Sequence, residues 1–323
     1  MNDQPIELAQ RDSAPRPAAD PYRRDAPNVV VIVLDDLGFA QLGCYGSSID
    51  TPNIDRLAER GVRLTNFHTT AVCSPTRACL LTGRNHHRVG MGMLPDMPVN
   101  FPAYTGRFPD GAATIAQILN DEGYATTAIG KWHLVPRDQR ATGPFDMWPT
   151  RLGFDRYYGF LNGETNQWTP NLVRDQQHVE PPATPDEGYH LDADLADEAI
   201  AQLRELHLHQ PDRPFFLWLH VMDPHDPWAP PEETSDSEGP KESRDFVDLD
   251  GFFNGTGVDL HTSIRMGRTR PTASEKLRFR RLYDAEVRYA DALVVDVLDA
   301  LRLNNHKDDT VVVLTSDHGE EFW

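Results

Sequence analysis

Four short apolar runs punctuate the chain, alternating with stretches of helical pattern. They are NVVVIVL with its core at 29 to 34, YATTAI at 124 to 129, FFLWLHVM at 215 to 222 and TVVVLTS at 310 to 316. Apolar runs of strand length that alternate with helices are typical of a layered α/β domain. The pattern therefore predicts an α/β fold with a buried sheet.

Each of these runs is followed at once by polar residues that can do chemistry. The four endings are Asp35-Asp36, Gly130-Lys131-Trp132-His133, Asp223-Pro224-His225 and Asp317-His318. In an open α/β sheet, ligands bind beyond the carboxyl ends of the strands, so these groups are expected to meet in one crevice. Polar residues after a single strand are mostly loop, but four such endings rich in Asp, Lys and His favour a functional site.

Two stretches lie outside this alternation. Residues 1–27 are rich in Pro, Ala and Arg, and their low apolar content predicts a flexible tail. The remainder, 28–323, is expected to form one catalytic domain, with a polar, turn-rich insertion at about 230–272. A long loop inside a compact domain is usually either functional or disordered, and the sequence leaves both readings open.

Composition limits the class of protein. The chain has 323 residues, 39% of them hydrophobic, enough to bury a globular core. Its net charge of −19 argues against nucleic acid or an anionic membrane as a partner. No apolar run approaches the roughly twenty residues of a bilayer crossing, and the N-terminus shows no signal-peptide pattern. Three cysteines cannot form a disulfide framework, which favours a reducing compartment, so we predict a cytoplasmic protein.

The stretch CSPTRACLLTG predicts a short helix that starts beside Cys73. Ser74 can cap it, Pro75 suits the first helical position and Gly83 suits the exit. A helix N-terminus favours anions, so a thiolate there would be activated and a nearby oxyanion would be held by free N–H groups. Arg77 lies one turn further and can reach back toward Cys73. The alternative is a small buried cysteine with no chemical role.

The carboxylates at the strand ends suggest a metal. Asp35, Asp36 and Asp317 are hard oxygen donors, which select Ca²⁺, Mg²⁺ or Mn²⁺ over softer metals. Crowded together without a cation they would repel one another. A strand-end turn or an exposed loop would explain either ending alone, but their joint placement favours a metal site.

Several motifs resemble those of the sulfatase family. CSPTR, starting at Cys73, resembles the C-x-P-x-R element of that family, and LLTGR continues its longer signature. GKWH, which contains Lys131, resembles the second sulfatase signature, and DPHDPWAPP, which contains His225, resembles the family's PHxPxxAP. NHHRVGMG at 85–92 looks closest to the arylsulfatase branch. The resemblance runs over about 28–323 in the family's order.

The resemblance implies an alkaline-phosphatase-like fold, with a mixed, largely parallel sheet flanked by helices. It also implies that a formylglycine-generating enzyme converts Cys73 to Cα-formylglycine, which hydrates to a geminal diol. One diol oxygen would attack sulfur and displace the alcohol or phenol, leaving a covalent sulfate ester. The second hydroxyl would then expel sulfate as the aldehyde re-forms.

The same resemblance assigns the metal ligands. Asp35, Asp36, Asp317, His318 and residue 73 in its formylglycine form would hold Ca²⁺, with Mn²⁺ or Mg²⁺ as alternatives. Arylsulfatases often carry Asn where this chain has His318. Some family members use His there, and the difference raises the weight of Mn²⁺ or of a phosphonate-type substrate without displacing Ca²⁺.

Four further roles follow from the resemblance. Arg77 and Lys131 would hold and neutralise sulfate oxygens, because negative charge shifts onto the leaving oxygen in the transition state. His133 would contact the diol and assist its collapse, and His225 would protonate the leaving oxygen as general acid. We expect Trp132, between Lys131 and His133, to be a core residue.

The function implied is that of a sulfuric ester hydrolase cleaving small-molecule sulfate monoesters. A phosphonate or phosphate ester hydrolase of the same superfamily is the alternative, because a metal and a cationic pocket also suit phosphoryl oxygens. Family members continue past the Asp-His ending with another active-site lysine and a smaller C-terminal α+β domain, whereas this sequence ends at EEFW. We therefore expect a truncated catalytic domain, and an inactive fragment is the third reading.

Overall fold

The computed structural model describes residues 26–226, 228–231 and 270–320. The predicted tail at 1–27 lies outside the described residues except for its last two positions. The predicted insertion at about 230–272 lies outside them except at its two ends. Both predictions therefore stay predictions.

A single seven-stranded sheet organises the described part of the chain, in the order β5-β4-β3-β2-β6-β1-β7. The strands are β1 (Asn28–Leu34), β2 (Ala125–Lys131), β3 (Arg156–Phe160), β4 (Leu172–Arg174), β5 (Gln177–Val179), β6 (Phe215–Val221) and β7 (Thr310–Ser316). The pairs from β3 to β7 are parallel, and β4 pairs antiparallel with β3 and β5. The predicted mixed, largely parallel α/β sheet is confirmed, and its four predicted strands are β1, β2, β6 and β7.

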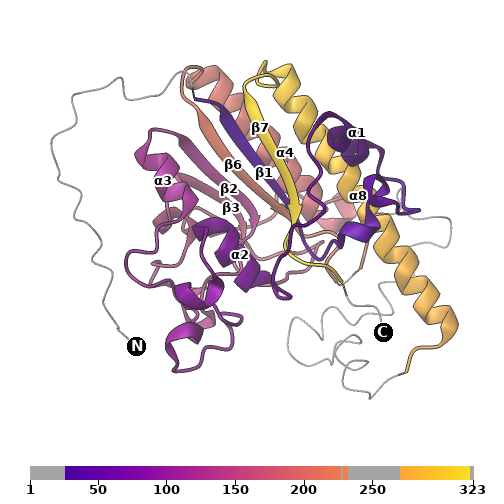
Figure 1. The fold of residues 1–323 in the computed structure, drawn as a ribbon, viewed down its shortest axis with the longest axis horizontal. Coiled ribbons are helices and arrows are strands. Elements are labelled where there is room, and N and C mark those ends of the chain that lie inside the picture. Colours follow the sequence, from indigo (N-terminus) through magenta and orange to yellow (C-terminus); the bar gives the residue numbers. More distant parts are fainter. Residues whose placement is uncertain (1–25, 227, 232–269, 321–323) are drawn as a thin grey trace.

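Helices cover both faces of this sheet (Figure 1). They are α1 (Pro52–Arg60), α2 (Cys73–Thr82), α3 (Ile115–Asp121), α4 (Leu191–His209) and α8 (Ala273–Leu303). Alternation along β1 separates two cores, because successive side chains of a strand point to opposite faces. Ile32 packs in the cluster that contains apolar residues of α4 and α8, and Val33 packs in the cluster that contains Ala78 of α2 and Ala116 of α3.

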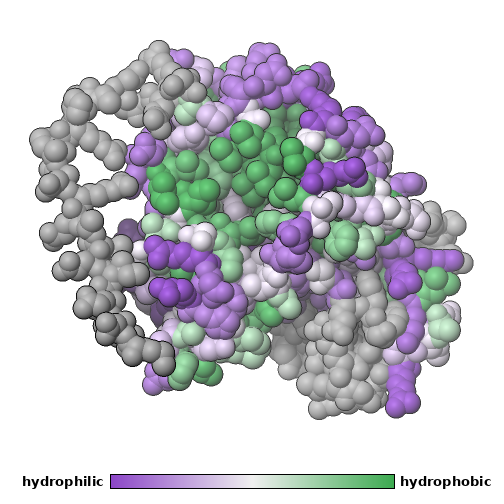
Figure 2. Space-filling model, viewed as in Figure 1, coloured by the Kyte–Doolittle hydropathy of each residue, from purple (hydrophilic) through white to green (hydrophobic). Residues whose placement is uncertain are grey.

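The face of the edge strand β7 is only partly covered. Val311 and Val313 remain 49% and 43% exposed. Figure 2 shows a hydrophobic area over the strands on the same side of the molecule. None of the described helices combines the length and the apolar character needed to cross a bilayer.

Candidate active site

The carboxyl ends of β1, β2, β6 and β7 meet at one edge of the sheet, as the sequence predicted. The backbone N–H of Asp36, after β1, donates to Oδ1 of Asp317, after β7, at 3.1 Å. Lys131, the last residue of β2, forms a buried ion pair with Asp35. His225 Nε2, after β6, lies 3.7 Å from Asp36 Oδ2. All four predicted endings therefore contribute to a single cluster.

Cys73 is the first residue of α2, so its predicted place at a helix N-terminus is confirmed. The predicted details of that start are wrong. Val72 is the N-cap, and Ser74 lies inside the first turn, where its hydroxyl donates to the carbonyl of His133 at 2.7 Å. Ser74 thus ties the helix to the end of β2 instead of capping it. Gly83 ends the helix with φ of 63°, as predicted for a glycine exit.

The thiol of Cys73 is surrounded by cationic groups. Its Sγ lies 3.1 Å from Nε2 of His318 and 3.6 Å from Nζ of Lys131, and the residue is 8% exposed. Burial alone would raise the pKa of this thiol, but Lys131, with the imidazoles of His133 and His225, lowers it well below its ordinary value. Residue 73 thus sits where an anionic oxygen or sulfur is stabilised.

Three carboxylates are buried together beside Cys73. Asp35 and Asp317 are fully buried and Asp36 is 5% exposed. Burial opposes ionisation of Asp35, but Lys131 outweighs it and lowers the pKa of Asp35 to about 2. Burial, followed by the charge of Asp35, raises the pKa of Asp317 well above its ordinary value. The chain alone thus leaves this cluster short of positive charge.

The unpaired atoms of this cluster fit a divalent cation. Oδ1 of Asp35 and Oδ2 of Asp317 are buried without a hydrogen-bond donor among the described residues. Asp36, Cys73, Asp317 and His318 each offer a ligand atom, and these atoms lie within 4.8 Å of one another. Buried acceptor oxygens with no donor are what a hard cation satisfies, so the residues present suit the metal that the sequence predicted.

Arg77 is fully buried beneath the site. Its Nε donates to the carbonyl of Trp132 at 2.7 Å, its Nη2 donates to the carbonyl of Lys131, and its Nη1 lies 3.4 Å from Nε2 of His220. Burial lowers the pKa of Arg77 to about 10. These contacts fix the end of β2, so the predicted contact of Arg77 with sulfate oxygens stays a prediction.

His225 and Trp132 lie where their predicted roles need them. The Nδ1 of His225 contacts the carbonyl of Asp226, and the residue is 8% exposed. Trp132 is fully buried, with its Nε1 donating to the carbonyl of Met147 at 2.8 Å. Trp132 is therefore a core residue, as expected.

Sequence reasoning missed three polar residues of the site. His220, inside β6, is fully buried with Nε2 3.8 Å from Oδ1 of Asp35. Glu164 offers an oxygen within 4.8 Å of ligand atoms of His225 and Asp226, and burial raises its pKa. Asp96, on a loop, lies 3.3 Å from Nε2 of His133. The alternation of His220 with apolar neighbours in FFLWLHVM was a usable signal, whereas Asp96 carried none.

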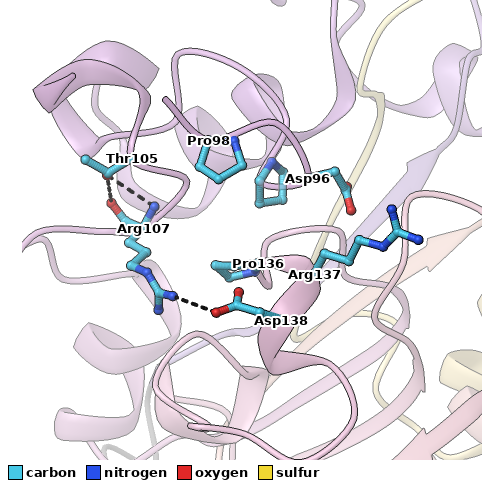
Figure 3. Close-up of a pocket in the computed structure, with 8 residues that line it drawn as sticks. Asp96, Pro98, Thr105, Arg107, Pro136, Arg137 and Asp138 are labelled. Carbon is cyan, nitrogen blue, oxygen red and sulfur yellow. Dashed lines mark hydrogen bonds and ion pairs between the residues drawn. The ribbon is translucent and has the colours of Figure 1, made fainter. Parts of the chain in front are cut away.

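A hollow of about 590 Å³ adjoins Asp96. Prolines and charged side chains line it: Pro95, Asp96, Pro98, Thr105, Arg107, Pro136, Arg137 and Asp138. Figure 3 shows the carboxylate of Asp96 pointing away from the pair formed by Arg107 and Asp138, whose charged atoms are 3.8 Å apart. Asp96 thus lines the hollow and also contacts His133.

Known proteins resemble this chain in sequence. An uncharacterized sulfatase of Schizosaccharomyces pombe is 32% identical over 330 residues, covering 91% of this chain and 58% of the relative. Human arylsulfatase A is 41% identical over 165 residues, which is 50% of this chain and 30% of that protein. An arylsulfatase of Klebsiella aerogenes is 31% identical over 65% of this chain and 46% of its own length.

The fold has a matching counterpart among solved structures. The crystal structure of Ps i-CgsB in complex with k-i-k-neocarrahexaose superposes with a TM-score of 0.67 at 28% identity, covering 90% of this chain and 58% of that one. The chain thus spans a little over half the length of these two fullest matches. The family model described as Sulfatase matches residues 27–322, nearly the whole of the chain and every motif discussed above, so this chain belongs to the sulfatase family.

Proposed function

We propose that this chain carries the catalytic core of an arylsulfatase-like sulfuric ester hydrolase that cleaves small-molecule sulfate monoesters. The observation that carries the proposal is the position of residue 73. It begins α2, its Sγ is 3.6 Å from the buried ammonium of Lys131, and it shares a cluster of ligand atoms with Asp36, Asp317 and His318. A nucleophile, a fixed cation and a hard-metal donor set thus meet at one point.

Two absent groups fit this arrangement. A Cα-formylglycine at residue 73, made by a formylglycine-generating enzyme, would supply an oxygen nucleophile in its hydrated form. A divalent cation, Ca²⁺ first and Mn²⁺ or Mg²⁺ as alternatives, would be held by Asp35, Asp36, Asp317 and His318 and would supply charge neutralisation beside that nucleophile.

The chain's own residues perform the remaining tasks. Lys131 keeps a positive charge in the buried site, because the charges of Asp35 and Cys73 overcome the effect of burial and raise its pKa. A sulfate ester carries a single negative charge, and the ammonium that already contacts Cys73 is placed to attract it. His225 donates a proton to the departing alcohol oxygen, which separates the ester's two halves without leaving an alkoxide.

A phosphonate or phosphate ester hydrolase is the second candidate. The observation in its favour is His318, which stands where arylsulfatases often carry Asn and which contacts both Asp36, at 2.9 Å, and Cys73. Comparing a sulfate monoester with a phosphonate monoester of the same alcohol decides between them. Higher kcat/KM on the sulfate supports the sulfatase, and comparable or higher values on the phosphonate favour the alternative.

Peptide mass spectrometry of the segment around residue 73 tests the proposal directly. The chain is produced with a formylglycine-generating enzyme, and we expect formylglycine or its hydrate at residue 73. Cys73→Ala should abolish turnover, while Cys79→Ala, at a half-buried cysteine of the same helix, should retain it. Turnover by a preparation in which every residue 73 is an unmodified thiol would contradict the proposal.

The activity must also be measured on a longer version of the protein. The chain spans 58% of its Schizosaccharomyces pombe relative, so activity confined to a longer version would identify these residues as an incomplete catalytic unit. The cytoplasmic location and the exclusion of nucleic acid and membrane as partners stay predictions from composition.

A further inference from the structure

The ring of His133 is held in an unusual place. His133 follows β2 with φ of 49°, in the left-handed region that costs a non-glycine residue free energy. Its carbonyl accepts from Ser74, and its ring packs against Gly163, where a Cβ would lie 2.5 Å from Cε1. Backbone strain of this kind persists where surrounding contacts fix the residue.

One contact to the ring is a charged one. Oδ2 of Asp96 lies 3.3 Å from Nε2 of His133. The guanidinium of Arg140 grips the same carboxylate through both nitrogens, at 2.7 Å to Oδ1 and 2.8 Å to Oδ2. Arg140 is itself anchored by its Nε, which donates to the carbonyl of Val135 at 3.0 Å. The carboxylate is therefore oriented by a bidentate pair before it meets the imidazole.

This contact decides the protonation pattern of the ring. A neutral imidazole has one N–H donor and one acceptor nitrogen. A carboxylate can only accept, so Nε2 must carry the proton and Nδ1 must keep its lone pair. Nδ1 of His133 is buried and has no hydrogen-bond partner among the described residues. A free acceptor is thus held beside residue 73, whose thiol responds to His133.

We propose that Asp96 is a positioning residue that keeps His133 in the Nε2–H tautomer, with Arg140 fixing the carboxylate. His133 can then accept a proton at Nδ1 from a hydroxyl of residue 73. The O–H bond breaks, its electron pair stays on oxygen, the proton joins the Nδ1 lone pair, and water removes it afterwards. The kinetic part of this inference rests on the proposed function, whereas the tautomer does not.

The competing explanation is that Asp96 and Arg140 only clamp two loops together. Asp138→Asn provides a matched control, because Asp138 lines the same hollow but pairs with Arg107 instead of His133 (Figure 3). Asp96→Asn keeps the size of the side chain but removes the obligate acceptor. Asp96→Glu keeps the charge and tests for rescue.

The first experiment is ¹⁵N NMR of the histidine-labelled chain with unmodified Cys73 in alkaline buffer, with His133 assigned through His133→Gln. We expect Nε2 of His133 to be protonated in the wild-type chain and in Asp138→Asn. Asp96→Asn should shift the ring toward the Nδ1–H tautomer or a mixture. A wild-type ring protonated at Nδ1, or an unchanged ring in Asp96→Asn, would overturn the inference.

The second experiment is kinetic and uses formylglycine-containing protein. Loss of an outer partner of a functional histidine typically costs about 10- to 100-fold. Asp96→Asn should lower kcat by that amount with KM unchanged, Asp96→Glu should recover part of the loss, and Asp138→Asn should match wild type. A raised KM with unchanged kcat would contradict the positioning role. If formylglycine-containing wild type turns over no sulfate ester, the proposed function fails while the NMR result still decides the tautomer.

Discussion

The Sγ of Cys73 lies 3.1 Å from Nε2 of His318, although the two residues are separated by 245 positions in the chain. Cys73 is placed by the start of α2 and His318 by the end of β7. Their contact therefore requires that β7 pair with β1 and that α2 pack against the same sheet. The nucleophile position and the last metal donor exist as a pair only in the folded chain.

Metal removal should destabilise the protein. A cation that binds the folded state alone adds about 2.7 kcal/mol to the free energy of unfolding at a hundredfold excess over its Kd. Chelation should therefore lower the Tm, and Ca²⁺ or Mn²⁺ should restore it. Asp317→Asn keeps the side-chain size but removes one charge, and should abolish most of the cation response. The exposed Asp309→Asn should keep it. Identical wild-type melting curves with and without cation would refute the metal site.

Arg77 offers a test of two roles. Its contacts with the carbonyls of Lys131 and Trp132 predict a stabilising role, because lysine cannot reproduce the two-pronged contact of a guanidinium. Arg77→Lys should lower the free energy of unfolding by about 1–3 kcal/mol in urea denaturation. The exposed Arg88→Lys is the control. Unchanged stability combined with weaker inhibition by inorganic sulfate would instead support the sulfate-binding role predicted from the sequence.

Loss of His225 should depend on the leaving group. A positioned general acid typically contributes roughly 10² to 10⁴ in rate when the leaving oxygen needs a proton. His225→Ala should therefore slow alkyl sulfates by that factor and change nitrophenyl sulfate much less, because nitrophenolate leaves without a proton. His209→Ala, at the exposed end of α4, should change neither. Equal slowing of both substrates in steady-state assays would remove His225 from the acid role.

A buried carboxylate away from the metal cluster predicts a pH effect on stability. Oε1 of Glu286, in α8, accepts from the N–H of Ala229 at 2.6 Å, and its Oε2 has no hydrogen-bond partner among the described residues. Burial, with the charge of Asp192, raises the pKa of Glu286 well above its ordinary value. The folded state therefore keeps a proton that the unfolded chain loses near pH ~4.3, and stability falls as pH rises between the two pKa values.

Glu286→Gln removes that dependence while it keeps an oxygen for Ala229. The variant should match wild type below pH ~4, and at neutral pH it should be more stable by on the order of 1 kcal/mol, because each pKa unit corresponds to about 1.4 kcal/mol. Urea denaturation across this range measures the difference. Glu59→Gln, at an exposed position, should follow wild type throughout. A Gln variant that is less stable than wild type at neutral pH would contradict the assignment.

The sequence by itself determined the strands, the helix that begins at Cys73 and the chemical groups at the strand ends. These features are local. A run such as NVVVIVL buries both faces of a central strand wherever that strand lies, and Gly83 ends a helix through its own backbone freedom. The motifs around Cys73, Lys131 and His225 are equally local, which is why the family could be inferred from them.

Only the tertiary structure decided which of these groups touch. The sheet order places β6 between β2 and β1, so His220 reaches Asp35 although a buried histidine in a strand looks like core. The path of one loop brings Asp96 to His133, and no periodicity announces a loop's path. Arg77 spends its donors on the carbonyls of β2, a contact set by helix packing. Partners distant in sequence depend on strand order and loop course, which are fixed by the packing of the whole chain.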